Sequence, residues 1–299
     1  MENCRDANAF TRTYLDSLLV TPQYLDSVTP DLSMELYGRR FASPIMICAF
    51  SHLSGQHPGG MVEMARGAAM ADICNFAGMG DTDELAGILS TGAGTVKIVK
   101  PYADREKVFS MLRWAEAHGA LAVGMDIDHS FGHDGYPDVV CGLEMAPVSL
   151  AELKRFVQAT RLPFVVKGVL SVQDAEKCAE AGVSGIVLSH HHGIMPYAVP
   201  PLMLLPKLRE AVGDRMDLFV DCGMDTGADV FKALALGAKA VCLGRCVLPA
   251  FHEEGAKGVA DYVNNMQNEL RAMMARTCSP DTAHIARGVI WNTAGECVG

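Results

Sequence analysis

Eight short apolar segments recur at fairly even spacing along this chain, and they constrain its fold more than any other feature. Each is apolar throughout, which is typical of parallel strands buried on both faces. Helical stretches lie between them, such as Leu150–Ala159, which begins with the capping-box pair Ser149 and Glu152. The segments are Pro44–Ala49, Ile73–Phe76, Thr95–Val99, Leu121–Ile127, Phe164–Lys167, Gly185–Ser189, Leu218–Asp221 and Ala240–Gly244. This alternation predicts an α/β fold, a (β/α)8 barrel of the TIM type.

The length of the chain predicts one domain rather than two. A chain of 299 residues with 49% hydrophobic residues can bury one large core, and such barrels commonly take about 250 residues. We expect a single domain over residues 1–299, with an N-terminal arm at 1–43, the barrel at 44–250 and C-terminal helices at 251–299.

The segments outside the barrel carry their own patterns. The arm reads as a helix over Ala9–Leu19 and a hairpin around Gly38, and we expect it to cap the barrel floor. Residues 257–275 place apolar side chains at helical spacing, so they predict an amphipathic final helix. Its methionines are expected to pack in the core.

Composition excludes several classes of function. A net charge of −10 without lysine- or arginine-rich runs argues against nucleic acid or an anionic membrane as partner. Ten cysteines lie singly, without the Cys-x-x-Cys pairs of zinc or iron–sulfur sites. The residues from Met1 to Asp6 are polar and lack the apolar core of an export signal. We therefore expect a cytoplasmic protein.

Ionisable residues follow the last strands of the predicted barrel. Lys167 ends the fifth strand, His190, His191 and His192 follow the sixth, and Asp221 ends the seventh. Active sites of these barrels lie at the carboxyl ends of the strands. The sequence therefore predicts a catalytic site built from these exits.

The exits of the seventh and eighth strands predict a phosphate site. Gly223 follows one strand, and Gly244 with Arg245 follows the other. In barrels of this kind, backbone N–H groups of these two loops bind phosphate, and an arginine adds an opposite charge. Glycine turns alone are common, so the paired occurrence and the arginine carry the prediction.

The residues at the ends of the fourth, fifth and sixth predicted strands indicate acid–base chemistry. Asp128 and His191 can converge across the barrel mouth, where a carboxylate raises the pKa of an imidazole and fixes its tautomer. Lys167 faces inward and needs an anionic partner or a lowered pKa. One histidine is expected to be catalytic, since strand alternation turns His190 away and His192 lies in the loop.

From about Asn8 to Arg287 the chain resembles the FMN-dependent 2-hydroxy-acid oxidases and dehydrogenases, the group of glycolate and lactate oxidases. The matching segments are 162–169, 187–191 and 219–238, together with Phe41–Ile45 and His57–Gly60. The resemblance implies bound FMN, with Lys167 beside the flavin ring. It also implies His191 as the base that takes a substrate proton while hydride passes to flavin N5, with Asp128 paired to it.

The resemblance further implies a set of contacts and an assembly. Small-molecule substrate binding would fall to Val99, His129, His133 and Ile194, and no metal is implied. The assembly would be a homo-oligomer, a tetramer by resemblance, with an electron acceptor that the sequence leaves unknown. The implied FMN contacts are Ala49, Phe50, Ser51, Gly78, Lys97, Asp126, Lys167, Ser189, Asp221, Gly223, Gly244 and Arg245.

The chain departs from the family at its substrate positions. Ungapped alignment puts Ile194 where the family has the arginine that binds the substrate carboxylate, and an aliphatic side chain cannot make that contact. By the same resemblance, Val99 stands where a substrate-binding tyrosine is expected, and Lys97 replaces a flavin-contacting glutamine. Asp225 replaces an arginine near the phosphate, where a carboxylate repels a dianion unless it turns away.

Four interpretations follow. The first is an FMN-dependent oxidoreductase whose substrate is not a simple 2-hydroxy acid, or is anchored by Lys97, His129 or His133. The second is a flavin-dependent isomerase without net redox change, and the third is a flavin-binding subunit without catalysis. The fourth is a metal-dependent enzyme using the histidines, which is disfavoured because His190 and His191 face opposite ways.

Overall fold

The computed structural model describes residues 6–286 and 288–298. Residues Met1–Arg5, which bear on the expectation of no export signal, and Arg287, where the family resemblance ends, lie outside them.

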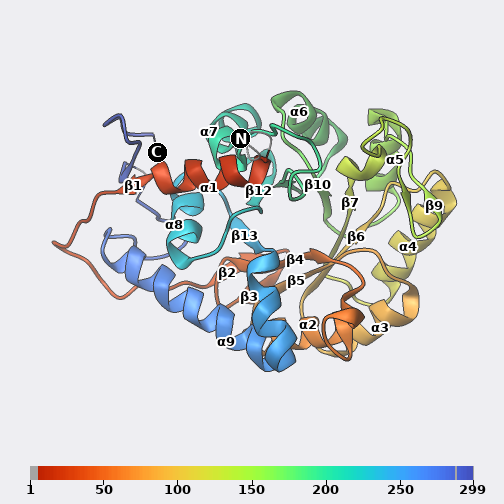
Figure 1. The fold of residues 1–299 in the computed structure, drawn as a ribbon, viewed down its shortest axis with the longest axis horizontal. Helices are drawn as coiled ribbons and strands as arrows, with labels where there is room; N and C mark the ends of the chain where they lie inside the picture. Colours follow the sequence, from red (N-terminus) through yellow and green to blue (C-terminus); the bar gives the residue numbers. More distant parts are fainter. Residues whose placement is uncertain (1–5, 287, 299) are drawn as a thin grey trace.

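Eight parallel strands close into a barrel in the order β10-β11-β12-β13-β4-β5-β6-β7 (Figure 1). None of the eight differs from its predicted apolar segment by more than one residue at either end. The strands are β4 Ile45–Phe50, β5 Cys74–Ala77, β6 Thr95–Val99, β7 Ala122–Asp126, β10 Phe164–Lys167, β11 Gly185–Leu188, β12 Asp217–Val220 and β13 Ala240–Leu243. The predicted (β/α)8 barrel is confirmed.

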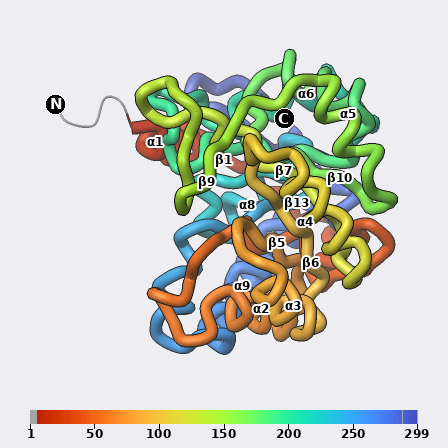
Figure 2. Tube along the Cα trace, turned by 90° about the vertical axis from the view of Figure 1, so that its right-hand side faces the viewer, coloured from red at the N-terminus to blue at the C-terminus, as the bar shows by residue number. Residues whose placement is uncertain are grey.

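A helix follows each barrel strand and covers the outside of the sheet. In two views, α2, α3 and α9 lie side by side along one flank (Figures 1 and 2). These helices are α2 Gly60–Met70, α3 Thr82–Ser90, α4 Arg105–Ala117, α5 Leu150–Gln158, α6 Val172–Ala181, α7 Pro201–Val212, α8 Gly227–Ala235 and α9 Leu248–Ala275. The capping box of Ser149 and Glu152 begins α5 as predicted.

The two parts of the N-terminal arm lie at opposite ends of the barrel. The hairpin of β2 Met34–Leu36 and β3 Arg39–Phe41 packs its apolar residues into the interior cluster that fills the barrel, as expected for the floor. The helix α1 Ala7–Ser17 instead lies at the other end, where Thr11 contacts His190. The expectation that this helix caps the floor is therefore wrong.

The C-terminal part begins with the predicted amphipathic helix. Two helical stretches meet at Gly255 to form α9, whose buried face includes Val259, Val263 and Leu270. After Ala275 the described chain holds no further helix, and β14 Ile290–Trp291 pairs with β1 Leu19–Val20. Within the described residues, no helix combines the length and the apolar character needed to cross a bilayer.

Candidate active site

A cavity of about 390 Å³ opens among the carboxyl ends of β4, β10, β11, β12 and β13, beside α1. Its position agrees with the predicted strand exits. The predicted site residues that line it are Ala49, Phe50, Lys167, His191, Asp221, Gly223, Gly244 and Arg245.

One end of the cavity, formed by Gly223, Gly244 and Arg245, has the character of an anion site. Gly223 takes a left-handed φ of 78°, and a Cβ built on Gly244 would meet no atom within 4 Å. The side chain of Arg245 makes no hydrogen bond or ion pair within residues 6–286 and 288–298. A guanidinium beside open backbone suits a bound phosphate. We call these three residues the phosphate end.

Arg12, which sequence reasoning missed, offsets the carboxylate of Asp225. Its guanidinium binds both oxygens of Asp229, at 3.1 and 2.8 Å, and donates to the Gly223 carbonyl at 3.2 Å. It also lies 3.8 Å from an Asp225 oxygen. A cation from α1 therefore balances this loop. No local signal could have revealed it, since the partners lie at opposite ends of the sequence.

The loop after β11 begins with a left-handed turn. His191, His192 and Gly193 have φ values of 46°, 55° and 82°. Non-glycine residues rarely adopt this region, and each costs about 1–2 kcal/mol. The turn directs the neighbouring histidines apart: His190 accepts from Gly193 N–H at Nδ1 and bonds Thr11 Oγ1 through Nε2 at 2.8 Å.

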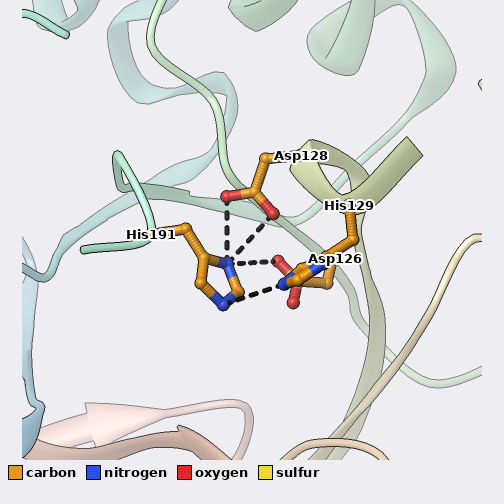
Figure 3. A group of neighbouring side chains, drawn as sticks. All are labelled: Asp126, Asp128, His129 and His191. Atoms are coloured by element: carbon orange, nitrogen blue, oxygen red, sulfur yellow. Dashed lines mark hydrogen bonds and ion pairs between the residues drawn. The ribbon is translucent and has the colours of Figure 1, made fainter. Parts of the chain in front are cut away.

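His191 lies at the centre of a polar cluster (Figure 3). Its Nδ1 is 3.1 and 3.2 Å from the two Asp128 oxygens and 3.1 Å from Lys167 Nζ. Its Nε2 is 3.1 Å from His129 Nε2. The predicted convergence of Asp128 and His191 is therefore present in the structure.

The charges around His191 hold a proton on it. Burial alone lowers the pKa of His191, but hydrogen bonds to Asp126 and Asp128 outweigh burial and raise the pKa to about 9. Burial and the charge of Asp126 raise the pKa of Asp128. Burial also opposes the charge of Lys167, yet Asp126 and Asp221 hold the Lys167 pKa well above its usual value.

Lys100 is a second buried ammonium that sequence reasoning missed. Its Nζ lies 2.6 Å from Asp126, whose other oxygen is 3.4 Å from Lys167 Nζ. We call the cluster of Lys100, Asp126, Asp128, His129 and His191, at the exits of β6, β7 and β11, the base end. The sequence could have revealed Lys100, because this residue continues the alternation that turns every second side chain of β6 toward the barrel interior.

The predicted residues Lys97 and Val99 lie outside the lining of the cavity at the strand ends. Val96 and Ile98 belong to the barrel interior, so the alternate residues Lys97 and Val99 face the surrounding helices. Lys97 lines a separate cavity of about 460 Å³ and donates to the Gly78 carbonyl.

Five other predicted site residues do not line the cavity, although one of them borders it. Ser189 is buried with its hydroxyl 3.5 Å from Lys167 Nζ, so it borders the site. Ser51 Oγ accepts from Met79 N–H, and a Cβ on Gly78 would overlap Ser51 and Phe50. Ser51 and Gly78 therefore shape the junction between β4 and β5, outside the cavity lining. His133 is exposed, and Ile194 is half-buried outside the cavity lining.

Asp126, Asp128, His129 and His191 could together offer four metal ligands. One ligand atom from each lies within 4.8 Å of the others. However, the ammonium groups of Lys100 and Lys167 already contact Asp126, and both nitrogens of His191 have polar neighbours. These cations supply the positive charge that a metal would bring, so we assign no metal here.

Comparison with known proteins gives consistent results. The family of FMN-dependent dehydrogenases matches residues 3–148 and 139–292. Glycolate oxidase 1 of Oryza sativa subsp. indica is 27% identical over 95% of this chain and 87% of its own. L-lactate oxidase of Alicycliphilus denitrificans is 30% identical over 81% of this chain and 76% of its own. A mandelate oxidase variant with an FMN adduct superposes with a TM-score of 0.89 at 28% identity, covering 96% of this chain and 92% of the other.

Proposed function

Because this chain belongs to the family of FMN-dependent dehydrogenases and is an FMN-dependent oxidoreductase, we propose that it oxidises a small molecule with His191 as base. One observation carries the proposal: His191, paired with Asp128, borders the cavity that ends in Gly223, Gly244 and Arg245. FMN supplies the ring that accepts electrons from substrate.

The phosphate end suits the phosphate of FMN. Arg245 has no opposite charge among the described residues, and Gly244 leaves room for an anion against the backbone. Lys167 would stand beside the flavin ring, where a fixed ammonium stabilises added negative charge. The lining residues Ala49 and Phe50 are suited to contact the ring through the exit of β4.

His191 would remove a proton from substrate, and Asp128 would hold it in place. The Asp128 carboxylate accepts from Nδ1–H, which leaves Nε2 as the nitrogen that exchanges protons. The left-handed turn at His191 and His192 fixes this orientation. We further propose that Ser189, whose hydroxyl accepts from His191 N–H at 3.0 Å, supports the same turn.

The charges of the base end favour a substrate without a carboxylate. Ile194 replaces the arginine expected to bind that group, and the ammonium groups of Lys100 and Lys167 already face Asp126. A carboxylate entering here would meet Asp126 and Asp128 with no unmatched cation to bind it. We propose that the substrate reacts at a C–H bearing a hydroxyl or amino group and is not a simple 2-hydroxy acid.

An absorption spectrum and anaerobic reduction test these statements. Protein purified with excess FMN should show flavin bands, and their absence would end the proposal. A panel of L-lactate, glycolate, mandelate and matched alcohols and amines without the carboxylate is then mixed anaerobically, and flavin bleaching is followed. We expect bleaching by a member without the carboxylate. Fast bleaching by L-lactate would contradict the substrate assignment, and binding without any bleaching would favour an isomerase or a non-catalytic subunit.

We also propose a reduced, cytoplasmic homo-oligomer, with the electron acceptor left open. Eight cysteines of the described residues, from Cys48 to Cys278, are free thiols, as in a reducing compartment. Sedimentation of the FMN-bound protein tests the assembly, and a single monomer at micromolar concentration would contradict it.

A further inference from the structure

Four side chains from the loops after β7 and β11 form a continuous row. Asp128 bonds His191 Nδ1, His191 Nε2 lies 3.1 Å from His129 Nε2, and His129 Nδ1 lies 2.9 Å from Asp138 Oδ2. Figure 3 shows His129 at the nitrogen of His191 opposite to Asp128. The side chain of Asp128 is 11% exposed, whereas those of His191, His129 and Asp138 are 28%, 20% and 23% exposed.

The row needs one proton more than two neutral imidazoles carry. Ionised carboxylates only accept, so each of the three contacts requires a hydrogen from an imidazole. Two neutral rings hold two such hydrogens, and three contacts need three. The third hydrogen occupies the bond between His191 and His129.

The surroundings decide where that proton rests. Lys167, Asp126 and Asp128 face His191, while Lys100 and Asp138 act on His129. Hydrogen bonds to the carboxylates, working against burial, raise the pKa of His191 to about 9, whereas burial and then Lys100 lower the pKa of His129. At neutral pH the proton therefore rests on His191, and a protonated His191 cannot act as a base.

Resting on the function proposed above, we propose that His129 and Asp138 form a relay that removes this proton from His191. The N–H bond at His191 Nε2 breaks as one forms at His129 Nε2, and the positive charge moves to His129. The proton on His129 Nδ1 then passes to the Asp138 carboxylate and on to water. No electron moves, and His191 is left neutral with its Asp128 bond intact.

The loop after β7 is built to hold the acceptor in place. Asp138 accepts from Val139 N–H at 2.9 Å through Oδ1, so Oδ2 remains for His129. His129 itself lies in the short 3-10 turn Ile127–Ser130, directly after β7. Hydrogen bonds on both sides thus fix the relay, whereas His133 in the same loop is exposed.

The pH dependence of flavin reduction tests the relay. Asp138→Asn keeps the shape of the acceptor but removes its charge, so it should slow reduction by at least about tenfold at pH 7. Above pH about 9.5, His191 is neutral without help, and the variant should match the unchanged protein. Asp134→Asn, the same substitution at an exposed carboxylate of this loop, is the matched control. An equal loss at every pH, or no loss at pH 7, would overturn the relay.

Histidine NMR of the flavin-free protein gives an independent result. The relay predicts that His191 and His129 titrate as a coupled pair, and that His129→Asn leaves His191 with a single independent step. Independent titration in the unchanged protein would overturn the relay even if FMN reduction succeeds. Coupled titration in a protein that never reduces FMN would instead leave the relay standing and contradict the proposed function.

Discussion

The phosphate end and the base end differ in how their charges are matched. At the phosphate end, Arg245 lacks an opposite charge among the described residues. At the base end, Lys100 faces Asp126, and His191 faces Asp128. An unmatched cation is prepared for an anionic ligand, whereas matched charges favour an uncharged one. The comparison implies that one end selects the cofactor and the other selects against carboxylates.

Replacing His191 should distinguish the roles of the base end and the phosphate end with the largest expected effect. We expect His191→Asn to slow flavin reduction by about 10²–10⁴-fold, because a positioned base is lost, while FMN affinity stays unchanged. Stopped-flow absorbance with the panel member that bleaches the flavin measures the rate, and fluorescence titration measures the affinity. His192→Asn, next in the same loop, is the control. If both histidine variants lose activity equally, His191 has no special role.

Replacing Lys167 tests how strongly the base end depends on matched charge. Lys167→Met leaves Asp126, Asp128 and Asp221 without a shared cation, and breaking buried pairs of this kind costs about 3–5 kcal/mol. Urea unfolding of the flavin-free protein measures the change. Lys97→Met is the matched control, since this buried ammonium donates to the Gly78 carbonyl and forms no ion pair with a carboxylate of the described residues. A smaller loss at Lys167 than at Lys97 would contradict the argument.

The barrel was predictable because the burial of its strands requires an apolar pattern that can be read from local sequence. Strands covered on both faces need continuous apolar residues, and Phe164–Lys167 was predicted with its observed bounds. The helix α1 was misplaced because its position depends on contacts with distant residues. Thr11 meets His190, and Arg12 meets Asp229. No pattern within residues 7–17 specifies either partner.

The site was predictable wherever the fold alone brings residues together. Parallel strands end at the same face, so Lys167, His191 and Asp221 could be grouped from their positions. Lys97 and Val99 were assigned from the family resemblance, but they lie on the helix-facing side of β6, because adjacent residues of a strand face opposite ways. Asp138 was missed because its role comes from its contact with His129, which no local pattern shows, whereas Lys100 could have been found from the inward alternation of β6.

Arg245 offers the complementary test at the phosphate end. Arg245→Gln removes a charge-assisted contact worth about 1.5–3 kcal/mol, so FMN should bind about ten- to a hundredfold more weakly. The reduction rate of the flavin that does bind should not change. Arg113→Gln, an exposed arginine of α4, controls for net charge. Unchanged FMN affinity would show that the phosphate lies elsewhere.

The pH dependence of stability in the ligand-free protein measures the protonation of His191 at the base end. The pKa of His191 is raised from 6.5 to about 9 in the folded protein, where burial is outweighed by hydrogen bonds to Asp126 and Asp128. Its stabilisation is therefore complete below pH about 6.5 and is lost as pH rises through about 9. Urea unfolding between these limits should show a fall in the unfolding free energy. His191→Asn should flatten it, and an equal fall in that variant would assign the effect to other groups.

The smallest expected effect compares backbone strain at the two ends. His192 at the base end and Cys222 at the phosphate end both have positive φ, 55° and 68°, and each precedes a glycine. His192→Gly relieves about 1–2 kcal/mol of strain but costs about 0.5–1 kcal/mol in chain entropy, so stability should rise by no more than about 1.5 kcal/mol. Cys222→Gly should gain less, because the Cys222 thiol contacts Asp221 at 2.8 Å and is lost. Chemical denaturation of both variants measures the difference. A larger gain at Cys222 would mean that strain is concentrated at the phosphate end, and the left-handed turn could no longer be regarded as a device for aiming the base.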